Sequence, residues 1–192
     1  KEVTFEVADD AFFSDGTEIG AEDVAFTFKR LILKGASHLE AKRMIVGGEQ
    51  LSRIDQNIPG IQVIDKKHIK FLLQGAAPTF LFMCTIADTG IISRKQVDKD
   101  LQITAWGITS GAYKVISKNA DRWVLEANKT CLYHSELSPR VVNIQLSNSK
   151  EAWTPEIYRE KITILLNKIE SRECDLIYYS PFPNSQITNM IG

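Results

Sequence analysis

The sequence has little cysteine. Its three cysteines, Cys84, Cys131 and Cys174, are spread over 192 residues, which is too few and too widely spaced for a disulfide-rich scaffold. An odd number also cannot pair completely within one chain. At this length a chain can bury a sizeable hydrophobic core, so the fold does not need cross-links, and the cysteines leave the redox compartment undecided.

An excess of positive charge and a long apolar run are also missing. The 23 Lys and Arg residues against 24 Asp and Glu residues give a formal net charge of −1, so no basic field is available to attract phosphates. Nucleic acid is therefore disfavoured as a partner. No stretch approaches the about 20 apolar residues that a bilayer crossing requires, and we expect no membrane span in this chain.

Motifs for catalysis and for phosphate binding are absent as well. The sequence has no G-x-S-x-G turn and no recognisable cysteine-protease context, which disfavours a hydrolase. It has no G-x-G-x-x-G or G-x-x-x-x-G-K-[ST] loop that would hold phosphates at the start of a helix. We therefore predict that the chain is not an enzyme and carries no cofactor.

The patterns that are present predict a mixed α/β (α+β) fold. In chain order we expect a strand over residues 3–7, a helix over 21–33, a weaker helical stretch over 37–54 that is broken at Gly47 and Gly48, a hairpin over 61–73, a short helix over 79–86, a hairpin with arms at 113–116 and 123–127, a strand over 141–146, a helix over 155–171 and a strand over 176–179. The composition changes at Trp106, so we place a domain boundary near residue 105. The predicted domains are 1–105 and 106–192.

One pair of residues suggests a metal site. Cys131 and His134 are three positions apart, and a thiolate and an imidazole at that spacing can share one ion, with Cys174 or His38 as possible distant ligands. Zinc sites normally need three or four protein ligands, and no matching second pair is present. The interpretation without a metal is therefore favoured.

Two further groups allow a functional and a structural interpretation. Glu22 and Asp23 could act as an acid and a base, but two carboxylates in the first turn of a helix are explained by the helix dipole. Phe80, Phe82 and Met83 could line a ligand groove, but an apolar stripe of this kind is more often part of the core. We treat both groups as structural.

Six segments resemble one protein family. Residues 13–17 (FSDGT) and 21–28 (AEDVAFTF) resemble the hallmark of the family 5 extracellular solute-binding proteins, the oligopeptide and dipeptide receptors of ABC importers. Residues 61–73, 77–81, 109–115 and 171–175 are similar to later segments of that family, in the same order. These matches occur in the same order as in the family and together cover about residues 3–180. A chance match of a single motif therefore does not explain the resemblance.

The sequence departs from the family pattern at several positions. Glu18 stands where the family usually has Pro, Gly20 where it has Thr, Ala112 where it has Pro, and Arg172 where it has Gly. The first two changes weaken the turn and the helix cap but are compatible with a strand, a turn and a helix. These departures indicate a divergent member of the family.

The resemblance implies a fold and a size. It implies a fragment of a periplasmic-binding-protein-like fold (type II, cluster C), with residues 1–105 as the accessory domain inserted in the N-terminal lobe and 106–192 as part of that lobe. Family members are usually more than twice as long, with two lobes that close over a ligand at a hinge. The first residues already form a strand and the last lack a clear terminal element, so we expect a piece of a longer protein.

The resemblance also implies a function. It implies the substrate-binding component of an ABC importer, which binds a peptide or a related small solute and delivers it to a membrane permease. The expected location is periplasmic or extracellular, with a lipoprotein anchor possible in the parent protein. Tyr178, Tyr179 and Ser180 are the expected ligand contacts, although residues 177–179 also have the pattern of a buried strand. The alternative is a small-molecule-sensing domain of a transcription regulator.

Overall fold

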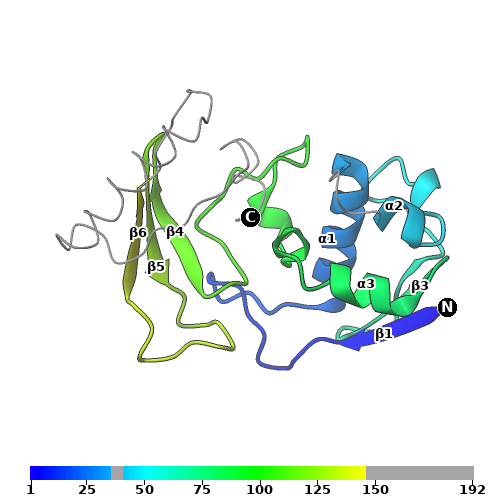
Figure 1. The fold of residues 1–192 in the computed structure, drawn as a ribbon, viewed down its shortest axis with the longest axis horizontal. Coiled ribbons are helices and arrows are strands. Elements are labelled where there is room, and N and C mark those ends of the chain that lie inside the picture. Colours follow the sequence, from blue (N-terminus) through cyan, green and yellow to red (C-terminus); the bar gives the residue numbers. More distant parts are fainter. Residues whose placement is uncertain (36–40, 146–192) are drawn as a thin grey trace, which may run out of the picture.

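The computed structural model describes residues 1–35 and 41–145, and it contains two three-stranded antiparallel sheets (Figure 1). The strands are β1 (Glu2–Glu6), β2 (Ile61–Val63), β3 (His68–Leu72), β4 (Tyr113–Lys118), β5 (Arg122–Ala127) and β6 (Val141–Gln145). The helices are α1 (Ala21–Lys34), α2 (Ala41–Met44) and α3 (Ala77–Met83), with 3-10 turns η1 (Gly48–Gln50), η2 (Ala87–Thr89) and η3 (Arg94–Gln96). The expectation of a mixed α/β fold is confirmed.

The first sheet has the strand order β1-β3-β2. Val3 of β1 and Ile61 of β2 both pair with Phe71 of β3, so alternate apolar side chains gather on one face of the sheet. The Asp65 carboxylate closes the β2–β3 turn by accepting hydrogen bonds from the backbone N–H groups of Lys67 (2.8 Å) and His68 (2.9 Å). The hairpin predicted over residues 61–73 is confirmed.

Helix α1 begins and ends where the sequence predicts. Gly20 is its N-cap in extended conformation, and the Asp23 carboxylate accepts a hydrogen bond from the Gly20 N–H (2.9 Å). At the other end Gly35 adopts φ = 65°, a left-handed conformation that favours glycine, and its N–H donates to the Leu31 carbonyl (3.2 Å). The predicted helix over residues 21–33 is confirmed with one further residue.

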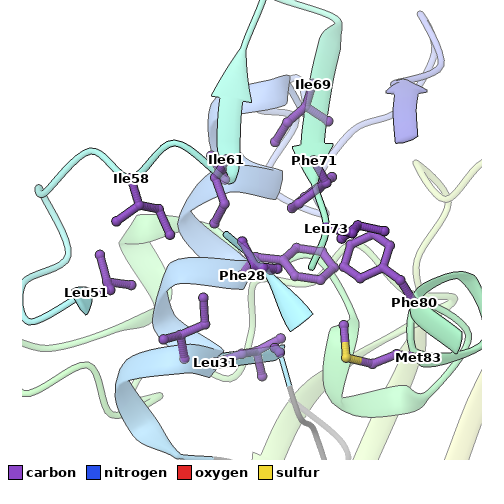
Figure 2. Close-up of a cluster of buried hydrophobic side chains, with 14 of the residues drawn as sticks. Phe28, Leu31, Leu51, Ile58, Ile61, Ile69, Phe71, Leu73, Phe80 and Met83 are labelled. Carbon is purple, nitrogen blue, oxygen red and sulfur yellow. The ribbon is translucent and has the colours of Figure 1, made fainter. Parts of the chain in front are cut away.

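The core lies between α1, the first sheet and α3. Figure 2 shows Phe28 from α1 and Phe80 from α3 meeting Phe71 of β3, and the Phe71 ring centroid is 4.8 Å from that of Phe28 and 5.0 Å from that of Phe80. Tilted ring pairs at such distances add to the stabilisation that burial of each ring provides. Pro78 lies in the first turn of α3, as predicted, where its missing N–H costs no hydrogen bond.

The second sheet is a meander in the order β4-β5-β6. The β4–β5 register is irregular between Val115 and Ser117 and then places Lys118 opposite Trp123. The Asn119 side chain closes the turn by accepting a hydrogen bond from the Arg122 N–H (2.7 Å). The second predicted hairpin and the strand near residues 141–146 are confirmed.

The two sheets lie on opposite sides of residues 84–112 in the view of Figure 1. We call residues 1–35 and 41–105 the first region, residues 113–145 the second region, and residues 106–112 between them the connecting segment. The domain boundary near residue 105 stays a prediction. The predicted helix over 155–171 and strand over 176–179 lie outside the described residues.

The weak helical stretch predicted over residues 37–54 is shorter than predicted. In its described part, α2 spans four residues and is followed by the short η1 turn, because Ile45 forms a β-bridge with Leu73 directly after α2. The predicted break at Gly47 is confirmed, since this residue adopts φ = 80°. Among the described helices, none has both the length and the apolar character needed to cross a bilayer.

Candidate functional site

The residues expected to contact ligand, Tyr178, Tyr179 and Ser180, lie outside the described residues, so their role stays a prediction. The described residues do bring the family-like motifs together at one place. The turn at residues 13–17, the connecting segment and residues 128–130 meet between the two sheets. We call this meeting place the junction.

The turn at residues 13–17 forms because its side chains satisfy its own backbone. The Asp15 carboxylate accepts a hydrogen bond from the Thr17 N–H (3.0 Å), and the Phe13 N–H donates to the Thr17 carbonyl (2.8 Å). Gly16 has φ = 80°, which glycine adopts at little cost. The Phe13 side chain is completely buried, so the turn is anchored at its first residue.

Ser14 connects this turn to the connecting segment. Its N–H donates to the Thr109 carbonyl (2.8 Å), its hydroxyl donates to the Gly107 carbonyl (3.0 Å), and its Oγ accepts from the Thr109 N–H (3.1 Å). These contacts join residues more than 90 positions apart in the chain. One small side chain thus holds two distant segments together.

Asn128 and Thr130 connect the second region to the connecting segment and to the turn at residues 13–17. The buried Asn128 side chain donates to the Gly111 carbonyl (2.8 Å), and its backbone N–H donates to the Ala112 carbonyl (2.8 Å). The Thr130 hydroxyl lies 2.7 Å from Asn128 Oδ1 and 3.1 Å from the Phe13 carbonyl oxygen. Buried polar groups with several partners fix a local geometry.

An aromatic pair and a lysine lie at the start of the connecting segment. The ring centroids of Trp106 and Trp123 are 5.8 Å apart. The Lys118 ammonium lies 3.5 Å from the Trp106 centroid and 4.2 Å from that of Trp123, which is within cation–π range. Desolvation lowers the pKa of Lys118. This cluster attaches the connecting segment to the second sheet.

The carboxylate of the junction, Asp15, and that of Glu18 directly after the turn are ion-paired. Lys95 Nζ lies 2.8 Å from Asp15 Oδ2, and this hydrogen bond, followed by that from the Thr17 N–H, lowers the pKa of Asp15 to about 2. Hydrogen bonds from Lys66 and Lys67 lower the pKa of Glu18 to about 2. Both groups stay ionised at neutral pH and are poorly matched to proton transfer there.

The Cys131 and His134 pair forms a turn. The His134 N–H donates to the Cys131 carbonyl (2.9 Å), and His134 Nε2 lies 3.9 Å from Glu136. The other suggested ligands, His38 and Cys174, lie outside the described residues. Within residues 1–35 and 41–145, no group of three or more potential ligands could hold a metal ion.

The other residues for which the sequence allowed a functional role have structural roles. Asp23 accepts the hydrogen bond from Gly20 at the start of α1, and burial raises its pKa. Phe80 and Met83 are buried, as predicted, but Phe82 is 70% exposed. The prediction that Phe82 packs in the core was wrong because two positions along a helix reverse the direction of a side chain.

The residues that hold the junction were not predicted from the sequence. Counting outward from a two-residue loop at Ala120 and Asp121 would have placed Lys118 opposite Trp123, which is a usable signal. The roles of Ser14 and Thr130 had no such signal, because their partners are distant in the chain. Their identity as polar turn residues gave no indication of which segment they contact.

Solved structures with the same fold are solute receptors. The pheromone receptor PrgZ matches with a TM-score of 0.71 at 19% identity, covering 98% of this chain and 37% of its own. The Escherichia coli murein tripeptide binding protein MppA matches with a TM-score of 0.66 at 18% identity, covering 88% of this chain and 37% of its own. A periplasmic oligopeptide-binding protein from Borrelia burgdorferi matches with a TM-score of 0.63 at 21% identity, covering 85% and 33%.

The structural matches define the fold of the chain, and a sequence match to one family defines its family. The chain spans about a third of the length of these solved structures, and at such identities they show the fold alone. No curated protein sequence matches it. The family described as bacterial extracellular solute-binding proteins, family 5 (middle part), matches residues 1–185, and the chain therefore belongs to this family.

Proposed function

We propose that this chain is part of the substrate-binding component of an ABC importer and that the whole protein binds peptides. The observation that carries the proposal is the family match over residues 1–185. The fold match to a murein tripeptide binding protein and to an oligopeptide-binding protein supports peptides as the solute class. Nothing in the fold or the comparisons favours a sensing domain of a transcription regulator.

The proposed role consists of binding and release without catalysis. The paired carboxylates of Asp15 and Glu18 suit a scaffold, and burial raises the pKa of the Cys84 thiol to about 11, which disfavours a thiolate nucleophile at neutral pH. The proposed partner is a membrane permease, to which the loaded receptor delivers its solute. We place the protein in the periplasm or outside the cell, with a lipid anchor as one means of retention in the parent protein.

Calorimetry and thermal unfolding of the full-length parent protein with a library of short peptides test this function. A ligand that binds only the folded state stabilises it by about 2.7 kcal/mol at a concentration of 100 times Kd, so we expect a clear rise in Tm for the preferred peptides. Free amino acids of the same composition are the control. Neither heat nor a Tm shift across the library would contradict peptide binding.

Tyr178, Tyr179 and Ser180 are the proposed ligand contacts of this part of the protein. A tyrosine at a binding surface offers a large apolar ring and a polar tip. In the full-length protein we expect Tyr179→Ala to weaken peptide binding by about tenfold or more, the effect of losing an aromatic contact at a binding hot spot. Calorimetric titration measures this change.

Tyr133→Ala is the matched control, because it removes a tyrosine that is 84% exposed on the connection between β5 and β6. We expect it to leave peptide affinity unchanged. Equal affinities for the Tyr179→Ala variant and the unmodified protein would remove Tyr179 from the site while leaving the proposed function intact.

A further inference from the structure

The connecting segment is held from both sides by contacts of six of its residues. On the side of the first region, Ser14 makes three hydrogen bonds to Gly107 and Thr109, and the Ser110 hydroxyl donates to the Ile91 carbonyl (2.7 Å). A segment with so many fixed carbonyl and N–H groups has little freedom to change its backbone angles. It therefore lacks the property that a hinge requires, which is a few residues able to absorb large changes in φ and ψ.

The second region holds the same segment at both of its ends. At its start, Trp106 packs against Trp123, and the Lys118 ammonium lies over both rings. At its end, the buried Asn128 side chain donates to the Gly111 carbonyl, and the Asn128 N–H donates to the Ala112 carbonyl. The segment is thus attached to the first region by Ser14 and to the second region by the Lys118 cluster.

We propose that Ser14 and Lys118 are positioning residues, which hold the connecting segment between them and so fix the orientation of the first region relative to the second. Thr130 supports the same arrangement, because its hydroxyl reaches the Phe13 carbonyl directly across the junction (3.1 Å). If the protein closes around a solute, as the proposed function implies, the two regions move together as one body. The closing movement then takes place outside the connecting segment.

Lys118 acts here through its charge and its length together. An ammonium 3.5 Å from one ring centroid and 4.2 Å from another is attracted to both ring faces. Methionine keeps most of the length of lysine and loses the charge, whereas arginine keeps the charge and can stack on the same rings. Lys118→Met and Lys118→Arg therefore separate the electrostatic role from simple packing.

The test measures the distance between the two regions by pulsed electron spin resonance on the whole 192-residue chain without ligand. Spin labels are attached to Glu22→Cys on α1 and Val141→Cys on β6, which are both exposed positions, after Cys84, Cys131 and Cys174 are replaced by alanine. We expect one narrow distance distribution for this reference chain. A broad or double distribution in the reference chain would overturn the proposal.

In the labelled chain we expect Lys118→Met and Ser14→Ala each to broaden the distribution about twofold, because further orientations become populated. Lys118→Arg should retain the narrow distribution. The matched control is Lys114→Met, which removes a lysine from the same strand that pairs with Glu126 within the sheet (2.8 Å) and should leave the distribution unchanged.

Circular dichroism establishes that each variant is folded before its distances are compared. If Lys118→Met does not fold, Ser14→Ala carries the test, because it removes only one hydroxyl group from the junction. An unchanged distribution in the folded Ser14→Ala variant would overturn the proposal, as would equal broadening by Lys118→Met and Lys118→Arg. Because no ligand is present, these outcomes are independent of whether the protein binds peptides.

Discussion

The two regions differ in how their residues are held together. The first region contains the whole cluster of buried hydrophobic side chains around Phe28, Phe71 and Phe80 (Figure 2). In the described part of the second region, only Trp123 and Leu125 are buried hydrophobic residues. Its exposed large hydrophobic residues are Ile116, Leu132, Tyr133, Leu137 and Val141. A three-stranded sheet with so small a core depends more strongly on polar contacts and on its neighbours.

The two regions are stabilised by different kinds of interaction. In the first region, burial of apolar area provides most of the stabilisation, at about 25 cal/mol per Å² of apolar surface removed from water. In the second region, the best-defined contacts are the hydrogen bonds of Asn128 and the cluster of Lys118 with the two tryptophans. The first region should therefore be sensitive to lost volume, and the second region to lost polar partners.

The largest expected effect is that of Phe71→Ala. Phe71 is completely buried, and its ring contacts those of Phe5, Phe28 and Phe80, so its truncation should lower the free energy of unfolding by about 3–5 kcal/mol. Urea denaturation followed by circular dichroism measures this loss. The control is Phe82→Ala on α3, which should change the free energy of unfolding by no more than about 0.5 kcal/mol because Phe82 is largely exposed. Similar losses for the two variants would mean that the first region is not held by its core.

A smaller effect is expected for Asn128→Ala in the second region. The change leaves the Gly111 carbonyl and the Thr130 hydroxyl without the partner that Asn128 provides. Each of these partly buried hydrogen bonds contributes about 0.5–1.5 kcal/mol, and urea denaturation should detect a total loss of about 1–3 kcal/mol. Asn143→Ala on β6 removes an exposed asparagine that pairs with Arg122 and should cost much less. A loss below that of Asn143→Ala would show that polar contacts do not hold the junction.

The smallest expected effect is on the stability of the folded chain at acidic pH. Hydrogen bonding to Lys95 lowers the pKa of Asp15 from its ordinary value of 3.8 to about 2, so the ion pair stabilises the folded state above about pH 4. This contribution is lost as the pH falls from about 4 through about 2, because the unfolded chain takes up the proton first. Asp15→Asn should show a shallower decline of stability over this range than the unmodified chain.

Unfolding by urea at a series of pH values measures this decline. Asp10→Asn changes an exposed carboxyl group in the segment that precedes the turn and serves as the control. Identical pH profiles for the Asp15→Asn variant and the unmodified chain would contradict a contribution from the Asp15–Lys95 pair. The effect is small because surface ion pairs are screened by water and salt.

The sequence predicts local structure well where the signal lies within a few residues. Helix α1 could be placed from the spacing of Val24, Phe28 and Leu31, and both hairpins from alternation around polar turns. Phe82 could not be placed, because the side of α3 that faces the core depends on where the helix packs. The break at Gly47 could be predicted, but the end of α2 at Met44 could not, because the β-bridge between Ile45 and Leu73 joins segments that are distant in the sequence.

The junction could be predicted only in part. The family-like motifs at residues 13–17 and 109–115 identified the right segments, and Asp15 and Gly16 lie in the turn of the first motif. That Ser14 would bond to Gly107 could not be inferred, because the pairing depends on a contact across 93 residues of sequence. Contacts of this kind are set by the packing of whole regions.

Strand β1 has a consequence for the behaviour of the molecule at high concentration. Within the described residues it forms one edge of the first sheet, and its exposed side chains include Glu2 and Glu6. Two copies that joined along this edge in antiparallel fashion would place Glu2 of one opposite Glu6 of the other, and like charges directly opposite are destabilising. The edge is thereby protected against sheet extension between molecules, the first step of aggregation.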